Sequence, residues 1–251
     1  MKLPLLLPSL LLLGAAGCKP TASKPGPVAT DAGRAPVVGS AAVAAPATVL
    51  RVAHTTGPIK PDGELNEPDW NAIAARTWHF NDATGGEARP YSDARFLYDA
   101  DNLYIALYAS DNDIRAQVTA HDGPVWIDDS FALHLTPDLP GPGTPTYAFD
   151  ISATGVVTDV KRVPGAKDDI GWESGMKVGV DKDGSVNDAG DEDEEWVVEA
   201  VLPFRSMGLE GKPGTRLLVD ISRCDTPRRS KERRCGNWGS ARQRQVIELA
   251  P

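Results

Sequence analysis

DARFLYDADNLYIALYASDNDI, residues 93–114, is the stretch that decides the fold. Two runs within it, Ala94–Tyr98 and Leu103–Tyr108, are rich in aromatic and branched apolar residues, which pleated strands favour. Between them stand Asp101 and Asn102, and both residue types favour tight reversals. The stretch therefore predicts two strands joined by a short polar turn.

Blocks on either side extend this pattern. IKPDGELNEPDW, residues 59–70, predicts a short strand, a tight turn at Asp62-Gly63 and a capped helical turn. PVWIDDSFALHL, residues 124–135, predicts an exposed aromatic loop that enters another strand. In that strand large apolar residues alternate with Ala132 and His134, so we expect one face to pack and the other to face outward.

The chain beyond residue 49 carries many strand signals and few helical ones. Helical pieces are limited to Glu67–Ala75 and the turn after Pro203. Two packed sheets hide so many half-apolar strands, so the sequence predicts an all-β fold, an antiparallel β-sandwich of the immunoglobulin or jelly-roll kind with short helical turns. Further strands are expected at Tyr147–Ile151, Val156–Val160, Met176–Val180, Trp196–Leu202 and Arg216–Ile221.

The first eighteen residues look like a bacterial lipoprotein signal. Lys2 gives a positive start, Leu3–Leu13 is an apolar run too short to cross a bilayer comfortably, and small residues precede Cys18. In this pattern Cys18 becomes the lipidated first residue, so acyl chains would hold the protein in the cell envelope, at the outer membrane or periplasmic face or at the cell surface. The alternative is an ordinary secretion signal with an incidental cysteine.

Composition divides the rest of the chain. Residues 19–48 are mainly Ala, Pro, Gly, Thr, Ser and Val and predict a disordered tether, whereas residues 49–251 have a length that suits one sandwich domain. The whole chain has 26 Lys and Arg and 35 Asp and Glu, of which residues 1–48 hold four and one. Residues 49–251 therefore have 22 basic and 34 acidic side chains, a net charge of −12. This acidity argues against binding nucleic acid or lying flat on anionic lipid.

Cysteine usage agrees with export from the cytoplasm. Besides Cys18, the chain has only Cys224 and Cys235, which flank a segment that predicts a strand, a basic loop and a return strand. An exported protein with one such pair is expected to oxidise it to a disulfide. The alternative, a two-cysteine metal site, lacks nearby histidines and the short spacings that zinc prefers.

The three quoted blocks together resemble the carbohydrate family 9 binding domain (CBM9), over roughly residues 49–251. The resemblance implies a β-sandwich with a sugar-binding surface, usually found beside glycan-degrading enzymes. In sugar-binding members, a tryptophan at the place of Trp126 forms one wall of an aromatic clamp. Trp238 is the nearest match to the second wall. The alternatives are that Trp126 packs under a loop and that Trp238 covers the sandwich end beside the disulfide.

The polar part of that family pattern is altered here. Six positions after the first clamp tryptophan the pattern has an acidic residue, and this chain has Ala132. On the next outward strand the pattern uses an arginine, and this chain has Asp150. We therefore expect Asp128, Asp150 or His134 to bind sugar hydroxyls, while a changed ligand or the loss of sugar binding stays open.

Metal and catalytic motifs are weak. No nucleophile elbow, zinc-protease motif or phosphate loop is present, so no enzymatic activity is expected beyond assisting a glycoside hydrolase system. No cofactor and no metal ligand are assigned, although the resemblance allows structural calcium. His121-Asp122, next to Asp128-Asp129, is the one cluster that suggests a metal or acid–base site, and turn capping is its simpler explanation.

The expected function is thus a lipid-anchored, extracytoplasmic module that binds a saccharide or glycan end without chemistry of its own. One alternative is an envelope scaffold that docks another protein through the basic loop Arg228–Arg234, because opposite charge steers docking. A second alternative is a haem-binding sandwich, which would need axial ligands from Met176, Met207 or a histidine.

Overall fold

The computed structural model describes residues 49–251 except 140, 229 and 240–243. The predicted signal at 1–18, its lipidation site Cys18 and the predicted tether at 19–48 lie outside the described residues. Within the described part of the chain, no helix is long and apolar enough to cross a membrane.

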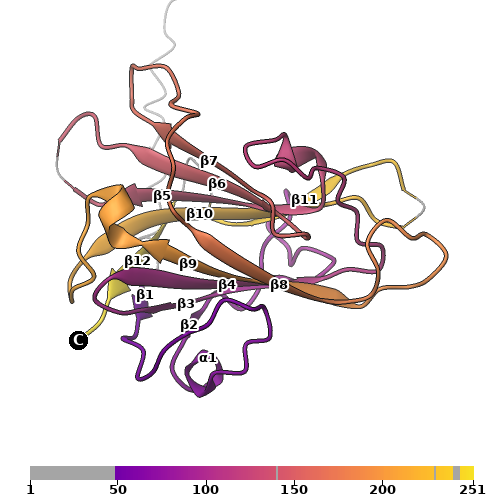
Figure 1. Cartoon of the computed structure of the whole chain (residues 1–251), viewed down its shortest axis with the longest axis horizontal. Helices are drawn as coiled ribbons and strands as arrows, with labels where there is room; N and C mark the ends of the chain where they lie inside the picture. The colour runs from indigo at the N-terminus through magenta and orange to yellow at the C-terminus, as the bar shows by residue number, and fades with distance from the viewer. Residues whose placement is uncertain (1–48, 140, 229, 240–243) are drawn as a thin grey trace, which may run out of the picture. The chain divides into compact units, whose positions relative to one another are not determined.

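Two β-sheets pack face to face (Figure 1), which confirms the predicted β-sandwich. The larger sheet has the order β1 (Val49–Val52), β12 (Gln245–Leu249), β10 (Arg216–Asp225), β5 (Ser130–Pro137), β6 (Thr146–Ser152) and β7 (Val157–Arg162), with β11 (Arg234–Trp238) paired to β10. The smaller sheet has the order β2 (Ala75–Arg76), β3 (Ser92–Tyr98), β4 (Asn102–Ser110), β9 (Glu195–Pro203) and β8 (Lys177–Asp183). The helical turns are α1 (Pro68–Ala72), η1 (Val125–Ile127) and η2 (Phe204–Met207).

The predicted hairpin at residues 93–114 is formed by β3 and β4, which pair antiparallel. Its turn is held by Asp99, whose carboxylate accepts hydrogen bonds from the backbone N–H groups of Asp101 and Asn102, at 2.8 and 2.7 Å. Among the named strand pairs, only β1 with β12 is parallel, a pairing that local sequence pattern does not reveal.

Most residues of β3 and β4 are buried, because both faces of this hairpin are covered. Phe96 and Ile105 face the other sheet in the main core, whereas Leu97 and Tyr104 face outward and pack against Trp70. The 59–70 block is therefore a cover over the outer face of the smaller sheet. Its helical turn is shorter than the Glu67–Ala75 expected from sequence.

A buried carboxylate fastens this cover to the sheet. Glu199 of β9 accepts hydrogen bonds from Trp70 Nε1 at 2.7 Å and from the backbone N–H groups of Gly63 and Asp62 at 3.0 and 3.2 Å. Gly63 has φ +93°, and a Cβ there would lie 2.2 Å from the backbone nitrogen of Asp181. Only glycine fits a turn that approaches β8 so closely.

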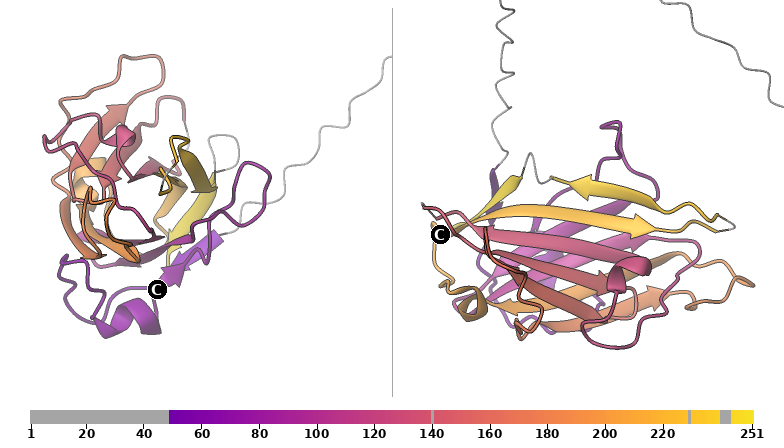
Figure 2. Two further views of the ribbon diagram at one scale, coloured as in Figure 1. Left: turned by 90° about the vertical axis from the view of Figure 1, so that its right-hand side faces the viewer. Right: turned by 90° about the horizontal axis from the view of Figure 1, so that it is seen from above.

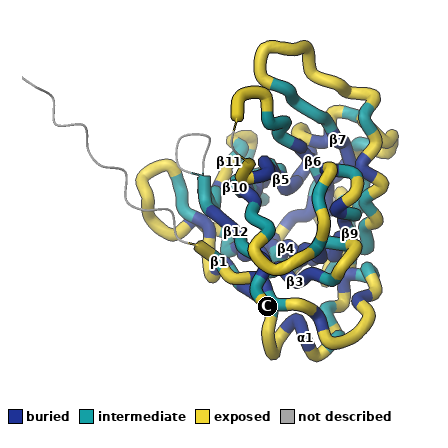
Figure 3. Tube along the Cα trace, turned by 90° about the vertical axis from the view of Figure 1, so that its left-hand side faces the viewer, coloured by how far each residue is buried: buried dark blue, intermediate teal, exposed yellow. Residues whose placement is uncertain are grey.

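The main core lies between the sheets, and Figure 3 shows buried residues along the strands and exposed residues mostly in the connecting loops. Phe131 of β5 contacts Trp196 of β9 with ring centroids 5.0 Å apart, so the two sheets meet through aromatic edges. The predicted disulfide is present between Cys224 and Cys235, which face each other across β10 and β11.

Candidate functional site

Trp126 projects into solvent from η1, the turn before β5. Trp126 is 56% exposed and Ile127 is 59% exposed. Val125, the first residue of the turn, is fully buried. The turn packs against β5 and β6 and lies on the outer side of the larger sheet (Figure 2). The indole expected from the sequence to be exposed is therefore presented at the rim of that sheet.

The chain itself fixes the conformation of this turn. The two carboxylate oxygens of Asp128 accept hydrogen bonds from the backbone N–H groups of Gln117 and Val118, both at 2.9 Å. Arg233 donates from Nη2 to the backbone oxygen of Asp128 at 2.5 Å and from Nη1 to that of Ile127 at 3.5 Å. Asp128 is 4% exposed, so its carboxylate holds the turn instead of facing solvent.

The outer face of the larger sheet carries polar side chains next to this turn. Because Leu133 and Phe149 are buried in the core, the alternation of a strand turns His134 and Asp150 to the outer face. Ala132 stands directly opposite Asp150 across β5 and β6.

His134 is oriented by partners on two other strands. Arg162 at the end of β7 donates from Nη1 to His134 Nε2 at 3.3 Å, which makes Nε2 the acceptor. The hydrogen on Nδ1 then points to Asp220 Oδ2 of β10, at 3.5 Å. Arg162 also pairs with Asp168, at 3.3 Å.

Asp150 is a partly buried carboxylate among positive charges. Burial raises the pKa of Asp150, and the positive charges of Arg162 and Arg233 counteract part of that rise. Within the described residues, no donor forms a hydrogen bond to its carboxylate. Its oxygens are therefore free to accept hydrogen bonds from the hydroxyl groups of a ligand.

Trp238 faces the other way. It pairs with Ile221 across β10 and β11, and directly opposite residues point to the same face, here the core. Its ring centroid lies 6.3 Å from that of Phe96, on the opposing sheet. The structure thus places Trp126 and Trp238 on opposite sides of the larger sheet and does not bring them together.

Residues named by the alternative hypotheses also have positions. In the basic loop, Arg228 donates to the backbone oxygen of Ala189 at 3.2 Å, and Arg233 binds the η1 turn as described. Met207 is buried in the core, while Met176 lines a surface cavity near β7 and β8. Two arginines of the loop thus contact their own chain.

Arg162, Arg233 and Asp220 were missed by sequence reasoning. They come from β7, from the end of the disulfide-closed loop and from β10, and no motif links them. One available signal concerns Trp238. Pairing Cys224 with Cys235 sets the register of the hairpin, which puts Trp238 opposite Ile221, an apolar residue in an alternating strand.

Comparisons with protein-family models and with curated proteins gave no match. Solved structures do match. A CBM9 module from Caldicellulosiruptor kristjanssonii in complex with cellotriose aligns with TM-score 0.54 and 16% identity, over 81% of this chain and 94% of that one. The glucose complex of a CBM9 module from that organism aligns with TM-score 0.53 and 15% identity, over 79% of this chain and 95% of that one. A candidate carbohydrate-binding protein from Bacteroides uniformis aligns with TM-score 0.52 and 12% identity, over 81% of this chain and 99% of that one. At these identities the likeness establishes the CBM9-like fold.

Proposed function

We propose that this chain is a carbohydrate-binding module without catalytic activity, and that the outer face of the larger sheet beside η1 is its ligand site. Two independent facts support the proposal. Structures of the same fold have been solved with cellotriose and glucose. On this chain, an exposed indole stands beside a polar sheet face with an unpaired carboxylate.

The chemistry of this surface suits a pyranose ring. A sugar has weakly apolar C–H faces and hydroxyl groups at its rim, so it needs a flat aromatic surface together with hydrogen-bonding groups. Trp126 offers the flat surface. Asp150 offers acceptor oxygens, and Arg162, which contacts His134, offers guanidinium N–H groups from the neighbouring strand.

The two departures from the CBM9 sugar-binding pattern compensate each other in space. The acid missing at Ala132 is replaced by Asp150, which stands directly across the strand pair. The arginine missing at position 150 is replaced by Arg162 and Arg233, whose positive charges both act on Asp150. The surface therefore keeps both an acidic acceptor and cationic donors, but they stand on different strands from those in the CBM9 pattern.

The observation that carries the proposal is the exposure of Trp126 on the same side of the sheet as Asp150. With one aromatic wall on an open surface, we expect millimolar to micromolar dissociation constants, about 4 to 8 kcal/mol of binding free energy.

Isothermal titration of the chain with glucose, cellobiose and cellotriose tests the site. Trp126→Ala should abolish measurable heat, because it removes the stacking surface. Trp78→Ala is the matched control. Trp78 is 69% exposed and lies between β2 and β3 of the smaller sheet, so its removal should leave sugar binding unchanged. Equal heats for Trp126→Ala and the unaltered chain would remove the proposed platform.

We further propose that Cys18 is lipidated, that residues 19–48 tether the domain to the envelope, and that the module assists glycan degradation. The composition of residues 1–48 supports the anchor. Metabolic labelling with a palmitate analogue tests it: the full chain should take up the label and Cys18→Ser should not.

A further inference from the structure

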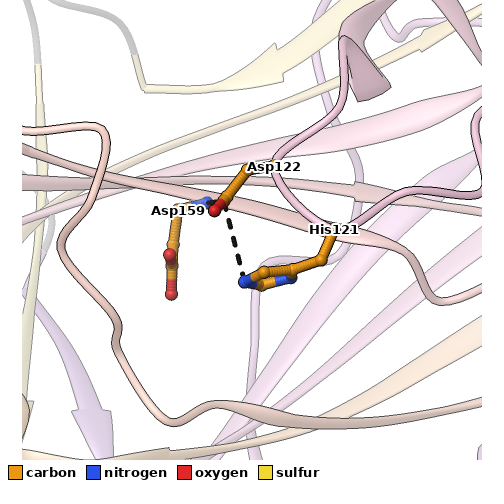
Figure 4. Close-up of side chains that lie close together, drawn as sticks. All are labelled: His121, Asp122 and Asp159. Carbon is orange, nitrogen blue, oxygen red and sulfur yellow. Dashed lines mark hydrogen bonds and ion pairs between the residues drawn. The ribbon is translucent and has the colours of Figure 1, made fainter.

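A second cluster lies at the open edge of the sandwich, apart from the surface around Trp126. His121 and Asp122 occupy a turn before η1, Asp159 belongs to β7, and Glu173 precedes β8. One ligand atom each from His121, Asp122 and Asp159 lie within 4.8 Å of one another (Figure 4). Nε2 of His121 is 3.7 Å from Asp122 Oδ1 and 3.1 Å from Glu173 Oε2.

Asp159 supplies an independent reason to expect a ligand here. Its side chain is only 2% exposed. Oδ2 accepts a hydrogen bond from the backbone N–H of Ser174 at 2.8 Å, whereas Oδ1 is buried without a hydrogen-bond partner among the described residues. Leaving a buried carboxylate oxygen unpaired is costly, and a bound cation would satisfy it. In Figure 4 this carboxylate faces the imidazole of His121 across a gap.

The cluster opens into a cavity of about 310 Å³ between β7 and β8. His121, Asp159 and Glu173 line it together with the apolar side chains of Met176 and Val178. An ion held by three of these side chains would therefore have room for a water molecule or a ligand atom at its fourth position, as in zinc sites that have three protein ligands.

The donor set selects the kind of ion. Calcium takes six to eight oxygen ligands, whereas an imidazole nitrogen with carboxylates suits zinc and its neighbours. Tetrahedral zinc with bonds of about 2.0 to 2.2 Å places its ligand atoms about 3.3 to 3.6 Å apart. Of the two distances from Nε2 of His121, 3.7 Å lies just above this range and 3.1 Å just below it, and side-chain rotations would bring the Asp159 carboxylate closer from within 4.8 Å.

We propose that His121, Asp122, Asp159 and Glu173 form a binding site for a divalent transition-metal ion of the zinc type. The bound ion would join the 119–123 turn, strand β7 and the segment before β8 across the open edge between the two sheets. Because metal binds the folded state only, occupancy should also raise the unfolding temperature.

Titration of the chelator-treated, tag-free chain with ZnCl₂ by calorimetry tests the proposal. We expect one zinc per chain and a rise in unfolding temperature when zinc is added. His121→Ala and Glu173→Gln should each weaken zinc binding about tenfold or more. Both side chains are exposed by half or more, so neither change should prevent folding. His79→Ala is the matched control, since His79 is an exposed histidine outside the cluster, and should bind zinc normally.

Several results would overturn the site. These are no zinc binding by the unaltered chain, undiminished binding by His121→Ala, or displacement of zinc by equimolar Ca²⁺. Trp126→Ala should bind zinc like the unaltered chain, so the outcome is independent of whether the sugar proposal holds.

Discussion

Asp111 and Arg223 form an ion pair inside the sandwich, with Asp111 Oδ2 2.7 Å from Arg223 Nη2 and both side chains no more than 3% exposed. Trp196 donates from Nε1 to the same oxygen at 3.0 Å. Arg223 belongs to β10 of the larger sheet, Trp196 belongs to β9 of the smaller one, and Asp111 directly follows β4. A single carboxylate oxygen therefore joins the two sheets.

Arg223→Met should destabilise the fold by about 3 to 5 kcal/mol, because it leaves the buried carboxylate of Asp111 without its counter-charge. Urea unfolding followed by tryptophan fluorescence measures the loss. The double variant Arg223→Met/Asp111→Asn should recover part of it, since the amide that replaces the carboxylate is neutral and can still accept from Trp196. As a control, Asp138→Ala removes the half-exposed partner of Arg216 and should cost about 0 to 1 kcal/mol. Similar losses for the buried and exposed pairs would contradict this account.

Glu199→Ala should cost about 3 kcal/mol or more, because the indole N–H of Trp70 and the backbone N–H groups of Asp62 and Gly63 would lose their common acceptor. Glu199→Gln should cost less, since one oxygen remains. Thermal or urea unfolding ranks the two variants. Exposed Glu64→Ala, on the same covering segment, should stay within about 0.5 kcal/mol of the unaltered chain. A Glu199→Ala protein as stable as Glu64→Ala would show that the cover is not fastened by this carboxylate.

Much of the sandwich could be predicted because its signals are local. Alternation of apolar and polar residues identifies β5, and the Asp101-Asn102 reversal identifies the β3–β4 hairpin. Two cysteines with no competing partner in the domain identify the disulfide. The parallel pairing of β1 with β12 could not be predicted, because it joins opposite ends of the domain.

The candidate site was predictable only in part. The loop-like context after Pro124 favoured an exposed Trp126, but it was equally compatible with a tryptophan packed under a loop. The neighbours of Asp150 depend on strand order and register, which place β7 beside β6 so that the charge of Arg162 acts on Asp150. Position in sequence also misled for His121, since its partners in space are Asp159 and Glu173, whereas Asp128 and Asp129 bind backbone N–H groups.

Stability should increase as pH falls from about 8 to about 5. Burial, together with the negative charge of Asp111, raises the pKa of Asp129 to about 7, against hydrogen bonds from the backbone of Arg115 and Thr226. In the unfolded chain Asp129 has its ordinary pKa, so between the two values the folded state binds more protons and is favoured by lowering the pH. Burial alone would lower the pKa of His121, but the Glu173 hydrogen bond and nearby carboxylates raise it overall. The folded state therefore also binds more protons at His121, so this residue too makes the fold more stable as the pH falls.

Urea midpoints at constant ionic strength measure this dependence, and Asp129 alone should contribute about 1 kcal/mol between pH 7 and pH 6. Below about pH 4 the trend should reverse, because hydrogen bonds hold the pKa of Asp69 below its usual value against its burial. Asp129→Asn should flatten the dependence near pH 7, and exposed Asp183→Asn should leave it unchanged. A stability that falls steadily from pH 8 to pH 5 would refute the assignment.

The disulfide should contribute about 3 kcal/mol by closing the loop from Cys224 to Cys235. Cys224→Ser/Cys235→Ser, compared with the oxidised chain by urea unfolding, measures this contribution. Adding a reductant to the unaltered chain should reproduce the loss, and should leave the double variant unchanged. If reductant destabilised both proteins equally, the effect would not come from this bond.

Arg233→Ala should weaken sugar binding about tenfold, a loss of about 1.4 kcal/mol. The expectation rests on the proposed function and on the contacts of this guanidinium, which donates to the backbone oxygens of Ile127 and Asp128 and to Ser130 Oγ at 3.1 Å. Its removal would loosen the turn that presents Trp126 and would take one positive charge from Asp150. Arg233→Lys separates these effects: lysine keeps the charge but cannot reach three acceptors with a planar fork, so affinity should recover only in part. Arg228→Ala is the control, because Arg228 lies in the same loop but donates to the backbone oxygen of Ala189, and this variant should bind sugar normally. An equal loss of affinity in both alanine variants would mean that the loop as a whole supports the site, and not the contact between Arg233 and η1.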